Sequence, residues 1–158
     1  MAEAFRLACQ KLPDLKLKIA GDGPLKTKLQ SKLASLGLGE KVEFLGLVSP
    51  LTLSHYMRRA SLLCLPSLSE GWPNVTMEAM ACGAPIVGAK VGGLPEQIIS
   101  EKYGRLCDPH SSSDIAEKIV SVIKSEWNHA HIAIHGKKYT RNSTAEAVFM
   151  IYKKILSY

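Results

Sequence analysis

Apolar and polar positions follow two different periods along the chain, one typical of strands and one typical of helices. Five short apolar or alternating runs predict strands, at residues 15–20, 42–45, 61–65, 85–89 and 104–107. Between them, helical spacing or turn signals predict helices over residues 24–36, 51–60, 74–82 and 95–99. Strands that alternate with helices predict an α/β fold, with a parallel sheet and helical crossover connections.

The two ends of the chain are predicted to be helical. Residues 4–12 form a helix ahead of the first strand, and two more helices cover about 126–138 and 143–157. Ser111 and the polar residues after it predict the cap of another helix. That helix presents four apolar side chains on one face: Ile115, Ile119, Val122 and Ile123. Nearer the start of the chain, Pro24 suits the first position of the helix predicted over residues 24–36.

Length and composition indicate an ordinary globular domain. The 158 residues are 46% hydrophobic and 22% charged, which excludes disordered, collagen-like and coiled-coil chains. No run of 18 apolar residues and no signal-peptide pattern occurs, so we predict a cytoplasmic protein without a transmembrane helix. The four cysteines lack a C-x-x-C pair, so neither a disulfide framework nor a zinc site is predicted. Cys64, Cys82 and Cys107 are expected to be small core residues.

The distribution of charge argues against a nucleic-acid partner. The net charge is +6, but residues 51–100 carry only three Lys or Arg and three Asp or Glu. The basic excess therefore lies in the flanks, where solvated helix faces explain it. No basic stripe interleaved with aromatic residues is present, so we predict no nucleic-acid binding.

The most informative stretch follows the strand over 61–65. That strand and the strand over 85–89 are apolar without alternation, so both are expected to be buried on two faces. Pro66 ends the first of them, which places Glu70 in a loop at the carboxyl edge of the sheet, where ligands bind in such folds. Pro73 then begins a helix.

The start of this helix predicts an anion site. Its free N–H groups, near Asn74, Val75 and Thr76, suit a diphosphate. Glu78 lies one turn further on, on the same face as Asn74 and Val75. Carboxylates such as Glu70 and Glu78 accept hydrogen bonds from paired hydroxyls, as on ribose or a hexose. The combination predicts a site for a nucleotide sugar.

These residues resemble a known signature. The Glu70-x7-Glu78 pair within residues 66–85 is similar to the signature of family 4 (group 1) retaining glycosyltransferases, in their C-terminal nucleotide-sugar-binding domain. Five further matches occur in family order: Ile19–Pro24, Val42–Gly46, Tyr56-x-x-x-Ala60, Val91–Glu96 and Gly104-x-Leu106. The resemblance implies the two-domain GT-B architecture, of which this chain would be the Rossmann-like C-terminal half. That half binds the donor, and the other domain mainly binds the acceptor.

The resemblance also implies roles for individual residues. Glu78 would take the ribose hydroxyls, and Glu70, the catalytic candidate, would lie beside the transferred sugar. The backbone of one loop would serve the sugar and the diphosphate, through Gly71, Trp72, Pro73, Asn74, Val75 and Thr76. The segment Leu47-Val48 would border the base, and Gly21 and Gly23 would let the chain pass close to the nucleotide. At Gly92-Gly93, turn geometry is favoured over contact.

The implied reaction is transfer of a sugar from a nucleotide diphosphate sugar to an acceptor hydroxyl, with retention. No metal or other cofactor is expected, and the absence of a D-x-D motif agrees with that. The acceptor would be a glycan, a lipid or a small molecule held by the N-terminal domain. The complete enzyme could also associate peripherally with a membrane.

The resemblance further implies that a segment is missing. The family's C-terminal domain normally begins with a strand ahead of the helix over 4–12, followed by a loop with an Arg and a Lys for the donor phosphates. We therefore expect residues 1–158 to be an N-terminally truncated C-terminal domain, inactive by itself. The strand over 15–20 would then lack its partner toward the strand over 61–65.

The last helix has two interpretations. Its apolar side chains Ala147, Val148, Ile151, Ile155 and Leu156 fit the family's tail that crosses back to the N-terminal domain. Without that domain, the apolar face would be exposed or self-associated. An ordinary helix packed on its own domain is the equal alternative.

The sequence also leaves two alternative functions and one alternative candidate site. A non-catalytic nucleotide-binding module remains an alternative, and a sugar-nucleotide epimerase on the same two-domain plan is a weaker one. His129, His131 and His135 superficially resemble metal spacing, but only His131 and His135 share a helix face. A solvated helix face is therefore favoured there.

Overall fold

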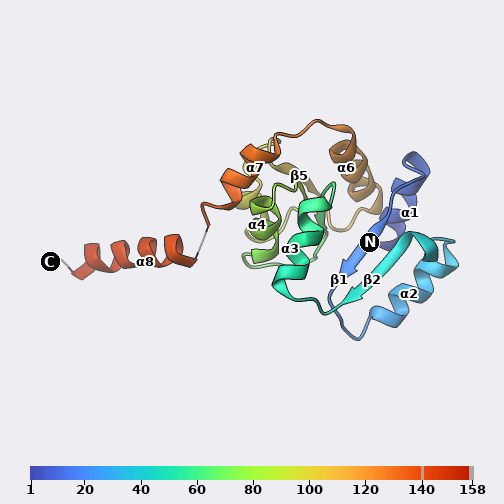
Figure 1. The fold of residues 1–158 in the computed structure, drawn as a ribbon, viewed down its shortest axis with the longest axis horizontal. Coiled ribbons are helices and arrows are strands. Elements are labelled where there is room, and N and C mark those ends of the chain that lie inside the picture. Colours follow the sequence, from blue (N-terminus) through green and yellow to red (C-terminus); the bar gives the residue numbers. More distant parts are fainter. Residues whose placement is uncertain (140, 157–158) are drawn as a thin grey trace.

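The computed structural model describes residues 1–139 and 141–156, the side chains of Arg141 and Thr144 excepted. It shows two small parallel sheets covered by helices (Figure 1). One sheet pairs β1 (Leu17–Ala20) with β2 (Val42–Gly46), and the other has the order β3 (Leu63–Leu65), β4 (Ile86–Ala89), β5 (Gly104–Cys107). The parallel pairing confirms the predicted α/β class.

The described residues of β1 and β3 are not hydrogen-bonded to each other, as expected for the strands over 15–20 and 61–65. β4 is buried along its whole length, which confirms that prediction. β3 is only half-buried, so the prediction of burial on both faces is wrong for this strand. Within the described part of the chain β3 has a strand neighbour on one side only, which leaves its other edge less covered.

Eight α-helices and one 3-10 turn are described in residues 1–139 and 141–156. They are α1 (Ala2–Lys11), α2 (Lys26–Ser35), η1 (Gly39–Lys41), α3 (Pro50–Arg59), α4 (Asn74–Ala81), α5 (Leu94–Gln97), α6 (Ser112–Lys124), α7 (His129–Gly136) and α8 (Arg141–Leu156). α2 begins two residues after Pro24, with Leu25 as its N-cap, so Pro24 is not a first helical residue. Gly23 and Pro24 instead belong to the turn after β1.

The core lies on both sides of β4. Ile86 packs in one cluster with Met80 of α4, Leu94 of α5 and Ile132 of α7. Val87 points the other way, into a cluster shared by α1 and the apolar face of α6. This division follows from the alternation of side chains along a strand. It makes a three-layer arrangement around the second sheet, with α4, α5 and α7 on one face.

The cysteines fit the core interpretation in part. Cys107 is buried, whereas Cys64 and Cys82 are half-buried. Burial raises the pKa of the Cys64 thiol to about 12 and that of the Cys107 thiol to about 11. Because the thiolate is the reactive form, these two groups behave as small apolar residues rather than nucleophiles.

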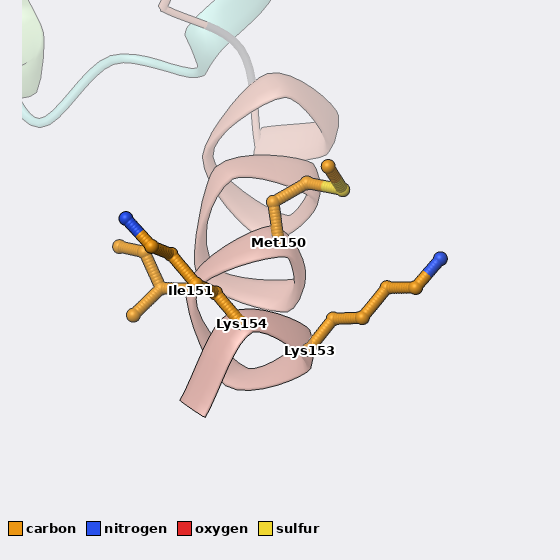
Figure 2. A pocket seen from close by; sticks show the side chains of 4 residues that line it. All are labelled: Met150, Ile151, Lys153 and Lys154. Carbon is orange, nitrogen blue, oxygen red and sulfur yellow. The ribbon is translucent and has the colours of Figure 1, made fainter. Parts of the chain in front are cut away.

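α8 projects away from the rest of the molecule (Figure 1). Its large apolar residues are exposed over their surfaces: Val148, Phe149, Met150, Ile151, Tyr152, Ile155 and Leu156. Figure 2 shows Met150 and Ile151 extending from different sides of the helix, and the four residues that line this pocket all belong to α8. The alternative in which this helix packs on its own domain is therefore wrong. No helix among the described residues is long and apolar enough to cross a membrane.

The predicted cap of α6 offers a test of local stability. The Ser111 side chain accepts a hydrogen bond of 3.1 Å from the backbone N–H of Asp114. Ser111→Ala is expected to lower the free energy of unfolding by about 1 kcal/mol, because one N–H of the first turn loses its acceptor. Urea denaturation measures this, with Ser121→Ala on the exposed side of the same helix as the control. An equal effect of both changes would contradict the capping role.

Candidate functional site

The loop between β3 and α4 rests on the glycine turn after β4. The backbone N–H of Gly93 donates to the carbonyl of Gly71 over 2.7 Å. A Cβ placed on Gly92 would lie 2.0 Å from the carbonyl oxygen of Glu70, and Gly92 has a φ of +51°. Both the positive φ and the close approach require glycine there. The prediction of turn geometry at Gly92 holds, and the structure adds direct contact between the two loops.

Each carboxylate is open to a ligand. Glu70 is half-buried in this loop, and Glu78 is exposed on α4. Within the described residues, neither side chain has a hydrogen-bond or ion-pair partner. Asn74 is exposed and Val75 is half-buried at the start of the same helix. The predicted face of α4 is therefore accessible, with an uncommitted carboxylate in the helix and another in the loop before it.

Buried polar groups hold the first turn of α4 on its core-facing side. Pro73 is the N-cap residue, and no side chain caps the helix in the usual way. The Thr76 hydroxyl reaches the carbonyl of Pro73 at 2.7 Å and also contacts Oε1 of Gln97. Nε2 of Gln97 donates to the same Pro73 carbonyl over 3.1 Å. Thr76 as a whole is fully buried, so it is not open to a ligand in the way that Asn74 and Val75 are.

Sequence reasoning missed Gln97. It is fully buried at the end of α5, between the buried residues Leu94 and Ile98. No local signal marks it, because α5 reads Leu-Pro-Glu-Gln and the neighbouring polar residue Glu96 is exposed, although a buried amide needs partners. The sequence does not indicate which groups those partners are.

The remaining predicted residues lie at the carboxyl end of the other sheet. Gly21 follows β1 with a φ of +121°, and its N–H donates to the carbonyl of Gly46 over 2.8 Å. Gly23 has open space around it, Leu47 is 85% exposed and Val48 is half-buried. The Gly21–Gly46 bond brings the loop after β1 beside the segment after β2. The two groups of site residues therefore occupy the carboxyl ends of two separate parallel sheets.

The prediction of a solvated helix face is wrong for His135, which is buried, whereas His129 and His131 are exposed on α7. His135 is 3% exposed, its Nε2 lies 2.9 Å from the carbonyl of Gln97, and its ring stacks on Tyr103. His131 meets the Tyr103 hydroxyl at 3.0 Å, and His129 meets the carbonyl of Gly83 at 2.9 Å. α7 packs against α4, and this buries His135. In residues 1–139 and 141–156, no three metal-ligand side chains gather.

This geometry defines a class of protein. It is an α/β domain with an acidic loop and an accessible helix start at the carboxyl edge of its sheets. The chain belongs to the family "Glycosyl transferases group 1", whose family model matches residues 1–139. It is 32% identical over 142 residues to an uncharacterized glycosyltransferase of Methanocaldococcus jannaschii, covering 90% of this chain and 40% of that protein. It is 35% identical over 159 residues to the D-inositol 3-phosphate glycosyltransferase of Mycolicibacterium smegmatis, covering 95% of this chain and 36% of that one.

Solved structures agree with this assignment. Sucrose-phosphate synthase from Thermosynechococcus elongatus matches with a TM-score of 0.80 at 23% identity, covering 99% of this chain and 42% of that one. The Anabaena protein HepE, in complex with UDP and glucose, matches with a TM-score of 0.81 at 26% identity, covering 97% and 44%. The fold is that of the C-terminal half of a GT-B glycosyltransferase. The chain thus spans well under half the length of these relatives.

Proposed function

We propose that this domain binds the nucleotide diphosphate sugar of a retaining glycosyltransferase, which transfers the sugar to an acceptor hydroxyl. The observation that carries the proposal is the accessible start of α4, with the unpartnered carboxylates of Glu70 and Glu78 beside it. The similarity to HepE, a structure with UDP and glucose, supports a nucleotide sugar as the ligand.

Each group would meet the part of the donor that suits its chemistry. The N–H groups at the start of α4 and the positive end of its dipole would hold the diphosphate. Glu78, one turn further on, would accept hydrogen bonds from the ribose hydroxyls. Glu70 would lie beside the transferred sugar and accept from one of its hydroxyls, which would orient the reacting face.

The sheet of β1 and β2 would hold the base. Leu47 and Val48 follow β2 and would border the base with their backbone. Gly21 and Gly23 have no side chain, so the chain there can pass close to the nucleotide. In this proposal no metal or other cofactor takes part. The charge that develops on the leaving diphosphate would be stabilised by the α4 N–H groups and by cations outside this chain.

Catalysis would need more than this chain. The relatives are more than twice as long, and the acceptor, whether a glycan, a lipid or a small molecule, would bind to their other domain. This chain would then bind the donor without transferring its sugar.

Calorimetry with UDP tests the proposal, beside an assay of donor hydrolysis. We expect UDP to bind with one site and uridine to bind at least tenfold more weakly, because a diphosphate is worth more than about 1.4 kcal/mol at a helix N-terminus with several N–H donors. ADP and GDP, titrated in parallel, identify the base preference. Failure of all three diphosphates to bind, or equal binding of UDP and uridine, would contradict the proposed function.

A further inference from the structure

One buried residue, Gln97, joins the three helices on one face of the sheet of β3, β4 and β5. Gln97, the last residue of α5, donates from Nε2 to the carbonyl of Pro73 and accepts at Oε1 from the Thr76 hydroxyl. Its own backbone carbonyl lies 2.9 Å from Nε2 of His135 on α7. The three side chains that make this network, Thr76, Gln97 and His135, are all buried. Gln97 therefore links α5 to both α4 and α7.

The donor and acceptor atoms around the Gln97 side chain allow only one orientation of its amide. The Pro73 carbonyl can only accept, so the amide nitrogen must face it and the amide oxygen must face Thr76. The Thr76 hydroxyl has one hydrogen and lies within reach of both the Pro73 carbonyl and Oε1 of Gln97. Exchanging the amide oxygen and nitrogen would set two carbonyl oxygens against each other. The network thus fixes the rotamer of Gln97 and the position of the Pro73 carbonyl together.

The same carbonyl belongs to the residue that precedes the ligand-facing turn. Pro73 is the N-cap of α4, and no side chain from the helix itself caps the free N–H groups. Asn74 and Val75 of this turn are accessible, while the Pro73 carbonyl is bonded by buried side chains. The anchor therefore acts on the turn that would meet the diphosphate without occupying any of its donors.

Packing alone does not account for a glutamine at this place. The neighbours of Gln97 along α5 and after it, Leu94 and Ile98, are buried apolar residues. An apolar side chain of the same length would fill the space without the cost of burying an amide. The amide adds directional bonds, and those bonds end on the first turn of α4.

We propose that Gln97 is a positioning residue, whose side-chain amide fixes the first turn of α4 in the orientation that binds a nucleotide diphosphate. This inference rests on the proposed function of the α4 turn as the diphosphate site. Thr76 supports the amide through its hydroxyl, and His135 holds the Gln97 backbone from the side of α7.

The test compares UDP affinity and local hydrogen exchange in matched variants. Gln97→Met keeps the length and removes both amide bonds, and we expect UDP to bind about tenfold more weakly or worse, since small misplacements of donors are costly. Thr76→Val should weaken UDP binding in the same direction, because it removes the hydroxyl that supports the amide. Hydrogen exchange of the peptide that covers α4 should be at least threefold faster in Gln97→Met.

Val122→Ala is the control for stability alone. Val122 is buried in the cluster on the opposite face of the sheet, so its truncation destabilises the fold without touching α4. It should leave UDP affinity and the exchange of the α4 peptide unchanged. A folded Gln97→Met protein with UDP affinity within twofold of the wild type would overturn the positioning role. If the wild type itself binds no nucleoside diphosphate, the proposed function fails, and unchanged α4 exchange in Gln97→Met would then overturn the positioning role independently.

Discussion

Gly92→Ala is expected to abolish nucleotide binding and to destabilise the domain. The new Cβ would lie 2.0 Å from the carbonyl oxygen of Glu70 and 2.9 Å from that of Gly71, which are backbone atoms and cannot rotate away. The backbone of the loop at Glu70 and Gly71 must then shift. We expect at least a tenfold loss of UDP affinity, measured by calorimetry, because the catalytic candidate and the neighbouring backbone move together.

A matched control separates this clash from backbone strain. Gly37 has a φ of +70° at the end of α2, and a Cβ there would meet no atom within 4 Å. Gly37→Ala should therefore show only the cost of a left-handed alanine, about 1 to 2 kcal/mol in the free energy of unfolding, with UDP affinity unchanged. Gly92→Ala should exceed that cost. Equal losses of stability in the two variants, with UDP binding intact, would show that the loop contact does not matter.

Glu78→Ala is expected to weaken UDP binding about tenfold to a hundredfold without lowering stability. Hydrogen bonds to a charged carboxylate are worth about 1.5 to 3 kcal/mol, and the ribose hydroxyls would lose theirs. Glu78 is exposed and has no protein partner among the described residues, so folding should not depend on it. Calorimetry with UDP and thermal denaturation measure the two effects.

The ribose assignment is tested by changing the ligand as well. 2′-Deoxy-UDP should bind the wild type more weakly than UDP does, whereas Glu78→Ala should not distinguish the two nucleotides. Glu117→Ala, which removes an exposed carboxylate from α6, controls for the general loss of charge. If Glu78→Ala bound both nucleotides like the wild type, the ribose role would be wrong.

The acidic pair can be predicted from the amino-acid sequence because its signals are local. A strand that stops at Pro66 places the next loop at the edge of the sheet, and helical spacing places Glu78 one turn after Asn74. The structure agrees on both points, with β3 ending at Leu65 and α4 beginning at Asn74. The prediction of a solvated helix face failed at His135 for the opposite reason. The burial of this residue depends on which face of α7 meets the rest of the domain, and a short helix with little amphipathic pattern does not indicate that face.

By itself, the sequence determined the order of strands and helices, the parallel α/β class and the loop that carries Glu70. Periodicity, turn residues and caps are properties of neighbouring positions, so they can be read along the chain. Only the tertiary structure decided that Gly92 lies against Glu70, that Gln97 holds Pro73 and that α8 leaves its apolar residues exposed. The first two are contacts between residues that are far apart in sequence, and close packing, rather than local preference, selects them. The exposure of α8 likewise depends on the rest of the fold and not on neighbouring positions.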